Sequence, residues 1–281
     1  AYYAEANKWL SEQPEEFRVI ALPIDGEGIT YNWTHGYAGL EPSAQLFDKP
    51  FISKTTYTSY VDDIIIRLEH LLFNSTCFWK AMALLNAKYI MVRWDVDYAE
   101  RAMSSPQTIT EALQKQIGIR YVRSFGKLDF YKLDDNLFLP RIYTVTPKPH
   151  LNPAFLTEEN LLSSSSVASL TAANFTKINP TKYLVHVNSS EPFLLVLSET
   201  FDPYWVIINN EDIPFISVSH FVANGYANGW IIFYSASTSY TITLEYYPQT
   251  LFDLGLRLSA ITLSLCVLWI CLERKNYRCR L

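Results

Sequence analysis

The chain has 281 residues, of which 49% are hydrophobic and 18% charged, and a formal net charge of −5. Without the four basic residues and the one acid of its last nine positions, 19 Lys and Arg remain against 27 Asp and Glu, a balance of −8. This excess of acid argues against nucleic acid as a partner, because phosphate binding needs clustered Lys and Arg. About 250 residues precede the apolar C-terminal segment, enough for one large domain or two ordinary ones, and we expect two.

The first half of the chain alternates strand and helix patterns. Residues 1–16 are too polar for a signal sequence or a membrane span, and residues 17–23 form a short apolar strand. An aromatic, Gly-containing loop without helical period follows, and then apolar residues recur at the three-and-four spacing of a helix over residues 58–73. Further helices are expected at 78–86 and 108–117, and strands at 88–94 and on both sides of Gly126. These patterns predict an α/β domain with a small sheet over residues 1–150.

One motif in this half has a possible chemical meaning. Asp95 and Asp97 follow the apolar strand directly, and D-x-D pairs at strand ends hold a divalent cation and a nucleotide-sugar diphosphate in one class of glycosyltransferase. No nucleotide-binding loop accompanies the pair, so we interpret it as two solvated carboxylates at a strand exit. Asp62 and Asp63, at a helix start, are explained by favourable charge near the helix N-terminus.

The second half contains strand patterns only. Residues 137–153 are extended and rich in proline, and we place a linker at residues 151–166. From 167 to 250, short apolar runs are separated by Asn, Ser, Pro and Gly turns, which predicts a β-sandwich of jelly-roll type. The predicted fold class is therefore α+β: an α/β unit, a β-sandwich and one C-terminal transmembrane helix.

Aromatic and amide side chains gather near the turns of the predicted sandwich. Aromatic faces stack on the apolar faces of sugars, and neighbouring amides bond the hydroxyl groups, although core packing competes as an explanation for each ring. The two Asn-Gly pairs are expected to turn the chain sharply and push Tyr226 and Trp230 outward. The candidate glycan-contacting residues are Tyr204, Trp205, Asn209, Asn210, Asn224, Tyr226, Asn228 and Trp230.

Residues 251–272 form the longest apolar stretch, long enough for a helix to cross a bilayer. The competing explanation is a buried core helix, but such helices usually keep a polar stripe. The basic segment 273–281 is typical of the cytoplasmic side, so we expect a single-pass protein of the cell membrane with the bulk of the chain extracytoplasmic. Because the first residue is Ala1, we expect an upstream portion, either a cleaved signal peptide or a larger membrane module.

Modification and metal binding can be judged from single residues. Cys77 is the one cysteine before the membrane segment, so no disulfide is expected there, while Cys279 could be acylated. Four sequons make N-glycosylation candidates of Asn32, Asn74, Asn174 and Asn188, with Asn188 favoured in a turn and Asn74 expected to be buried at a helix end. The five histidines lie far apart, and we expect no metal site, no cofactor and no catalytic residue.

Several segments resemble a known family. Residues 84–92, 139–145, 179–205 and 242–259 are similar to the C-terminal extracytoplasmic region of multi-spanning GT-C class membrane glycosyltransferases, including archaeal proteins and bacterial relatives that glycosylate cell-wall polymers. Asp202-Pro203-Tyr204-Trp205 stands where that family has Y-P-G-W, with Tyr replacing Gly. The resemblance implies glycan assembly at the outer membrane face with a polyprenyl-phosphate sugar donor. The acidic catalytic residue of those enzymes lies in a transmembrane module that has no counterpart in these segments.

Two functions follow as hypotheses. The first is an accessory, glycan-binding portion of a lipid-linked-sugar glycosyltransferase in cell-envelope assembly. The second is a single-span surface protein or envelope-complex subunit that uses the sandwich for protein contacts. The expected partners are the lipid bilayer, an envelope glycan or lipid-linked sugar, and other membrane subunits.

Overall fold

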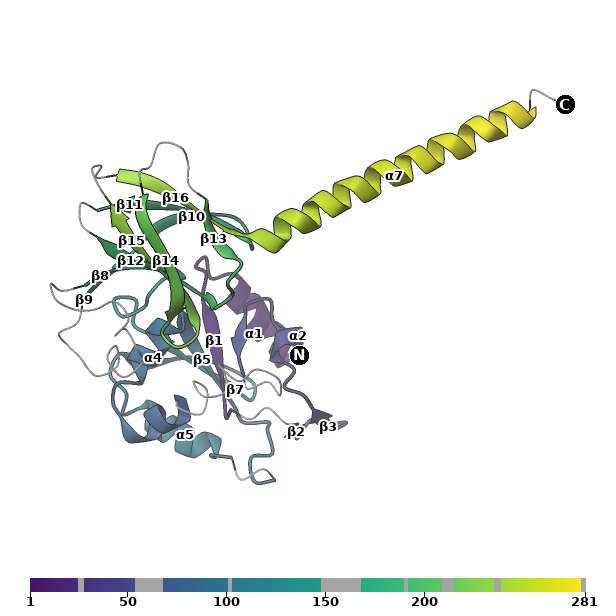
Figure 1. Ribbon diagram of the computed structural model, residues 1–281. Coiled ribbons are helices and arrows are strands. Elements are labelled where there is room, and N and C mark those ends of the chain that lie inside the picture. Colours follow the sequence, from purple (N-terminus) through teal and green to yellow (C-terminus); the bar gives the residue numbers. More distant parts are fainter. Residues whose placement is uncertain are drawn as a thin grey trace. The chain divides into compact units, whose positions relative to one another are not determined.

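The computed structural model describes residues 1–24, 28–53, 68–100, 103–147, 168–189, 192–208, 215–234 and 239–278. The chain forms two compact units that interleave along the sequence. The first unit comprises residues 1–173, 189–201 and 215–237, and the second comprises residues 174–188, 202–214 and 238–281. Figure 1 traces the elements from the N-terminus to the C-terminal helix.

The first unit contains a five-stranded sheet in the order β4-β1-β5-β7-β6. Its strands are β1 (Arg18–Leu22), β4 (Phe51–Ile52), β5 (Ala87–Arg93), β6 (Ile119–Phe125) and β7 (Leu128–Leu133). Strands β4, β1 and β5 are parallel, and β7 and β6 continue the sheet antiparallel. All seven residues of β5 are buried, as expected of a central strand covered on both faces. The strands expected at 17–23, at 88–94 and around Gly126 are thereby confirmed.

The helices of this unit are α1 (Tyr2–Ser11), α2 (Ser43–Leu46), α4 (Phe78–Leu84) and α5 (Pro106–Leu113), and residues 68–74 are also helical. Most of the helix expected at 58–73 lies outside the described residues. Helix α5 begins two residues earlier than expected, because Ser105 caps it by accepting a hydrogen bond from the Thr108 amide at 3.1 Å and Pro106 occupies the first turn. Helix α1 was not expected, and it covers part of the sheet with Ala6 and Leu10.

A second sheet of the first unit is antiparallel, in the order β14-β15-β12-β8-β9. Its strands are β8 (Ile142–Pro147), β9 (Ala168–Ala172), β12 (Phe193–Thr200), β14 (Phe215–Ala223) and β15 (Ala227–Tyr234). It shares one hydrophobic core with the α/β sheet. Two contacts join the sheets: Tyr226 donates to the Leu84 carbonyl at 2.8 Å, and Arg18 pairs with Glu199 at 2.8 Å.

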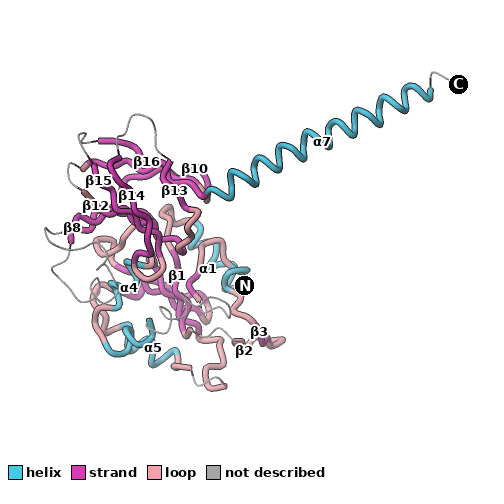
Figure 2. The backbone as a smooth tube through the Cα atoms, in the orientation of Figure 1, coloured by secondary structure: helices cyan, strands magenta, loops and turns pink. Residues whose placement is uncertain are grey.

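The second unit contains a four-stranded antiparallel sheet and one long helix. The sheet order is β10-β11-β16-β13, with β10 (Asn174–Asn179), β11 (Lys182–Asn188), β13 (Trp205–Ile208) and β16 (Ser239–Tyr246). Helix α7 (Tyr247–Arg278) starts at the residue after β16 ends, and Figure 2 shows the change from strand to helix at this point.

Helix α7 is long and apolar enough to cross a membrane from Tyr247 to Glu273, and no part of its apolar window is buried. The alternative of a buried core helix does not describe this segment. The structure extends the expected span of residues 251–272 by about one turn toward the sheet.

The α+β class is confirmed, with an α/β sheet, two antiparallel sheets of the kind from which sandwiches are built, and one C-terminal membrane helix. The short apolar runs expected to be strands between 167 and 250 lie at 183–187, 193–199, 204–208, 229–234 and 240–247, and they correspond to β11, β12, β13, β15 and β16. Strands β8, β9, β10 and β14 were not expected. The linker at 151–166 lies outside the described residues, and the domain boundaries stay a prediction.

Candidate functional site

The candidate site lies where β1 and β5 end, because ligands of open α/β sheets bind beyond the carboxyl ends of parallel strands. A short hairpin, β2 (Ile29–Tyr31) and β3 (Tyr37–Gly39), is attached there. The Asn32 amide donates to the Asp95 carbonyl at 2.7 Å, and the Asp97 amide donates to the Thr30 carbonyl at 2.8 Å. These bonds align the hairpin with the segment that follows β5.

A buried ion pair fixes this attachment. The Nη1 of Arg93 lies 2.7 Å from Glu41 Oε1 and 2.7 Å from the Tyr31 hydroxyl, and its Nη2 donates to the Pro23 carbonyl. Burial alone would lower the pKa of Arg93, but Tyr31 and Glu41 outweigh it and raise that pKa. Ser43 donates to Glu41 from both its hydroxyl and its amide. The charges of the pair are thus satisfied internally, and its role is to hold the hairpin against the end of β1.

Asp95 is the centre of the site. Its side chain is completely buried, and its Oδ2 accepts hydrogen bonds from the Tyr2 hydroxyl at 2.7 Å, the Tyr3 hydroxyl at 3.1 Å and the Trp33 indole at 2.7 Å. Its Oδ1 is also buried and has no hydrogen-bond partner among the described residues. Burial raises the pKa of both tyrosines first; next comes the hydrogen bond to Asp95 for Tyr2 and the charge of Asp95 for Tyr3, so both phenols stay protonated as donors.

These contacts correct the interpretation of the D-x-D pair as a solvated strand exit. Asp95 has no exposed surface, because α1 brings two tyrosines over it. Asp97 is half-buried and accepts a hydrogen bond from the Glu100 amide at 3.2 Å. Among the described residues, no group of three His, Cys, Asp or Glu side chains could hold a metal ion.

Five rings, Tyr2, Tyr3, Tyr31, Trp33 and Tyr37, form what we call the aromatic cluster. Trp33 is at its middle, 5.6 Å from Tyr3 edge-on, 4.5 Å from Tyr31, and stacked on Tyr37 at 5.6 Å. Tyr37 is 37% exposed and Trp33 is half-buried, so the cluster reaches the surface at the hairpin. Rings held in this way, beside hydrogen-bonding groups, can stack on the apolar face of a sugar.

The prediction that the Asn-Gly turns push Tyr226 and Trp230 outward is wrong. Trp230 is 1% exposed and stacks on His220 at 4.7 Å, and Tyr226 is buried against α4. Asn224 adopts a positive φ of 54° in the turn and donates to the Tyr143 hydroxyl at 2.6 Å, while Asn228 donates to the Glu199 carbonyl at 2.9 Å. The turns reverse the chain as expected, but the strand faces that carry the rings pack into the core.

The other candidate glycan-contacting residues differ from one another in exposure. Trp205 is buried between Tyr183 and Tyr246, whereas Tyr204 is 56% exposed. Asn209 and Asn210 lie outside the described residues. Tyr204 therefore keeps an accessible ring, and it belongs to the second unit, whereas Tyr226 and Trp230 belong to the first.

All four asparagines of the sequons, Asn32, Asn74, Asn174 and Asn188, are exposed, so Asn74 is not buried as expected. Asn32 is adjacent to Trp33, and a glycan there would cover the aromatic cluster.

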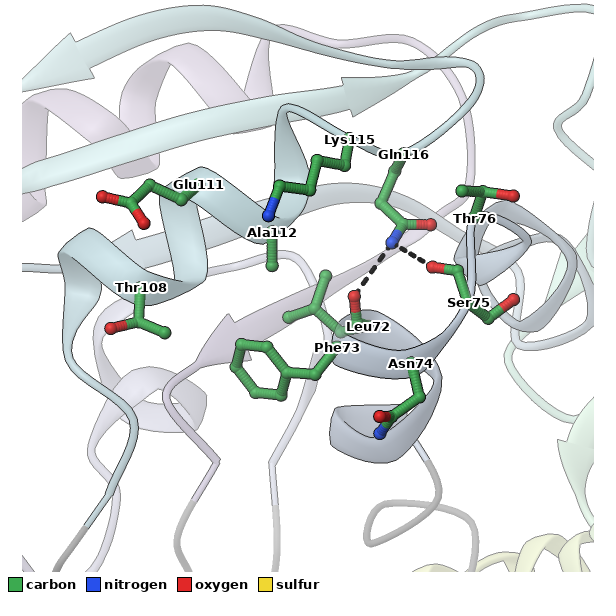
Figure 3. Close-up of a pocket in the computed structure, with 10 residues that line it drawn as sticks. All are labelled: Leu72, Phe73, Asn74, Ser75, Thr76, Thr108, Glu111, Ala112, Lys115 and Gln116. Atoms are coloured by element: carbon green, nitrogen blue, oxygen red, sulfur yellow. Dashed lines mark hydrogen bonds between the residues drawn. The ribbon is translucent and has the colours of Figure 1, made fainter.

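Asn74 borders a pocket of about 550 Å³ between residues 72–76 and α5, shown in Figure 3. In this pocket the Gln116 side-chain amide donates to the Leu72 and Ser75 carbonyls at 2.9 and 2.6 Å. These bonds cap the C-terminal end of the helix over residues 68–74, so the amide is not available to a ligand.

No family model matches this sequence, and no curated protein matches it either. Among solved structures, an arabinofuranosyltransferase AftD from mycobacteria is similar at 17% identity and a TM-score of 0.44, over 55% of this chain and 14% of that one. An R1389S mutant of the same enzyme gives 10% identity and a TM-score of 0.45, over 87% of this chain and 32% of that one. This chain spans a third or less of the solved chains.

The aromatic cluster was not predicted from the sequence, although two of its parts are visible there. The segment 26–40 is an aromatic loop, and Asp95 belongs to the D-x-D pair. The missing signal was α1, where Tyr3, Ala6 and Leu10 recur at the three-and-four spacing of a helix face.

Proposed function

We propose that this chain is a membrane-anchored accessory domain of cell-envelope glycan assembly, and that it binds a glycan at the aromatic cluster. The observation that carries the proposal is the buried carboxylate of Asp95, which holds three rings through a single oxygen. Such hydrogen bonds to a charged acceptor keep the rings in fixed orientations before any ligand arrives. A preorganised aromatic surface favours a rigid, partly apolar ligand such as a sugar ring.

The charges near the cluster favour a neutral glycan over a phosphorylated one. Arg93 is completely buried and already bonded to Glu41, so it offers no positive charge to a phosphate. Asp95 is negative and would repel an anion. The ligand class that remains is a sugar whose hydroxyl groups bond to amides and phenols while its apolar face stacks on Trp33 or Tyr37.

The membrane helix supports a location where such glycans are assembled. The apolar span ends at Glu273 and is followed by Arg274, Lys275 and Arg278, which favours a cytoplasmic C-terminus, so we assign the sheets to the outer side of the membrane. The sequence resemblance adds the setting of sugar transfer at the outer membrane face. We assign recognition to this chain, and transfer to a catalytic module of the kind that the resemblance implies.

The test is glycan binding by the full chain in lipid nanodiscs, with an array of neutral and acidic oligosaccharides followed by calorimetry. Tyr37→Ala should weaken binding about fivefold, since one stacked ring contributes on the order of 1 kcal/mol, whereas Tyr37→Phe should retain it. Tyr121→Ala, at a tyrosine on β6 that is 54% exposed, is the control and should bind like the wild type. All variants carry Asn32→Gln if the expression host N-glycosylates.

Absence of glycan binding by the intact chain, or equal binding by Tyr37→Ala, contradicts the proposal. If Tyr37→Ala instead abolishes capture of another membrane protein, the aromatic cluster is a protein contact. That result would support the alternative function, a single-span surface protein or envelope-complex subunit.

A further inference from the structure

A second cavity lies at the start of the membrane helix, entirely within the second unit. This anchor pocket has a volume of about 410 Å³ and lies between the ends of β10, β11 and β16 and the first three turns of α7. Figure 1 shows α7 leaving the sheet at this point. The pocket combines Leu251 and Leu254 with the charged side chains of Lys182, Glu245, Asp253 and Arg257.

The two acids of the pocket already have donors. Glu245 pairs with Lys182 at 2.6 Å and accepts from the Thr250 hydroxyl at 2.5 Å, and these two contacts lower the pKa of Glu245. Asp253 accepts from the Gln249 amide at 2.8 Å. A cationic ligand would therefore have to displace existing contacts.

Arg257 is different. It is exposed and has no hydrogen bond or ion pair to any described residue. Among the charged side chains that line the pocket, Arg257 is thus the one without a contact to a described residue, and its guanidinium has the forked geometry that suits a phosphate.

The depth of the pocket can be estimated from the helix. About 20 residues cross the hydrocarbon core, so counting back from Glu273 puts the outer hydrocarbon boundary near Leu254. Arg257 lies about one turn inside this boundary, and its long side chain reaches back toward the headgroups. Leu251 and Leu254 are both exposed at the depth where acyl chains begin.

We propose that the anchor pocket binds one phosphate-bearing membrane lipid, with its phosphate on Arg257 beside Lys182 and its first acyl carbons on Leu251 and Leu254. The bound lipid fixes how the four-stranded sheet sits on the bilayer. This site does not depend on the aromatic cluster and holds whether or not the cluster binds glycan.

The test uses the detergent-solubilised full chain and three soluble probes: dihexanoyl phosphatidylglycerol, dihexanoylglycerol and inorganic phosphate. The expected result is measurable binding of the phospholipid by calorimetry, with little binding of the other two. Arg257→Gln should weaken phospholipid binding about tenfold, because it removes a charge-assisted contact to phosphate. Lys177→Gln, the same charge change on β10 outside the pocket, is the matched control and should leave binding unchanged.

Three results overturn the proposal. Equal binding by Arg257→Gln shows that the pocket does not hold the phosphate. Binding of dihexanoylglycerol as tight as that of the phospholipid indicates apolar contact alone. Binding of inorganic phosphate as tight as that of the phospholipid indicates a free-anion site. Circular dichroism of Arg257→Gln should match the wild type, since the residue is exposed on a helix.

Discussion

The indole of Trp33 donates to the carboxylate of Asp95 over 2.7 Å, across 62 residues of sequence. Through this bond and two phenols, one buried charge connects the N-terminal helix, the β2–β3 hairpin and the end of β5. The aromatic cluster, which joins segments far apart in the sequence, therefore depends on that single oxygen.

Asp95→Asn should destabilise the fold by about 1–3 kcal/mol, because an amide cannot replace a charged acceptor for three donors. Equilibrium urea unfolding measures the loss. Asp97→Asn is the control and should cost less than about 0.5 kcal/mol, since Asp97 is half-buried and has one backbone contact in the structure. Equal stability of the two variants would show that Asp95 does not hold the cluster together.

Trp230→Ala should cost about 3–5 kcal/mol, because the ring is fully buried and its removal leaves a cavity beside His220. Tyr204→Ala, at an exposed ring of the second unit, should shift the melting temperature by no more than a few degrees. Thermal unfolding of the two variants makes the comparison. A melting temperature for Trp230→Ala close to that of the wild type would indicate that Trp230 faces outward, as expected from the sequence.

Stability should fall with acid through Asp135. Lys88 at 2.9 Å and then Lys132 at 2.9 Å lower its pKa to about 2. A carboxylate with a depressed pKa stabilises the fold above its unfolded value of about 3.9, and this contribution is lost as pH falls through about 2. Asp135→Asn should therefore cost a few tenths of a kcal/mol near pH 6, the usual size for an exposed pair, and much less near pH 2, where the folded carboxyl is about half protonated. Urea unfolding across that range tests it, and an undiminished difference at pH 2 contradicts it.

Deletion of residues 251–281 should release a soluble, folded chain, because β16 is complete at Tyr246 and the Tyr247 amide still donates to the Tyr204 carbonyl at 3.0 Å. Gel filtration and the β-type circular dichroism of the truncated chain measure the outcome. Aggregation with loss of that signal would show that α7 is required by the sheet.

Local sequence patterns predicted most of the strands, because a buried strand such as β5 reads as an unbroken apolar run. They did not predict β8, whose segment resembled a proline-rich linker. Strand β8 is recruited by pairing with β12, with Val145 opposite Leu194, and this partner lies about 50 residues further along the chain.

The site was harder to predict for a related reason. Asn-Gly pairs indicate that a chain reverses, but they do not indicate which face of the flanking strands is covered, and Tyr226 and Trp230 face the core. A D-x-D pair likewise gives no information on whether another element lies over it. The environment of Asp95 is decided by α1, which is remote in sequence and short enough that its periodicity is weak.

Strand β16 and helix α7 share a boundary without a spacer, since one ends at Tyr246 and the other begins at Tyr247. The span of 27 residues measures about 40 Å, longer than the roughly 30 Å of hydrocarbon it has to cross. In a thinner bilayer the helix has to lean further to keep its apolar surface covered. With no spacer at the junction, that lean also tilts the four-stranded sheet, so membrane thickness changes the angle between this sheet and the bilayer surface even when a lipid holds the sheet against it.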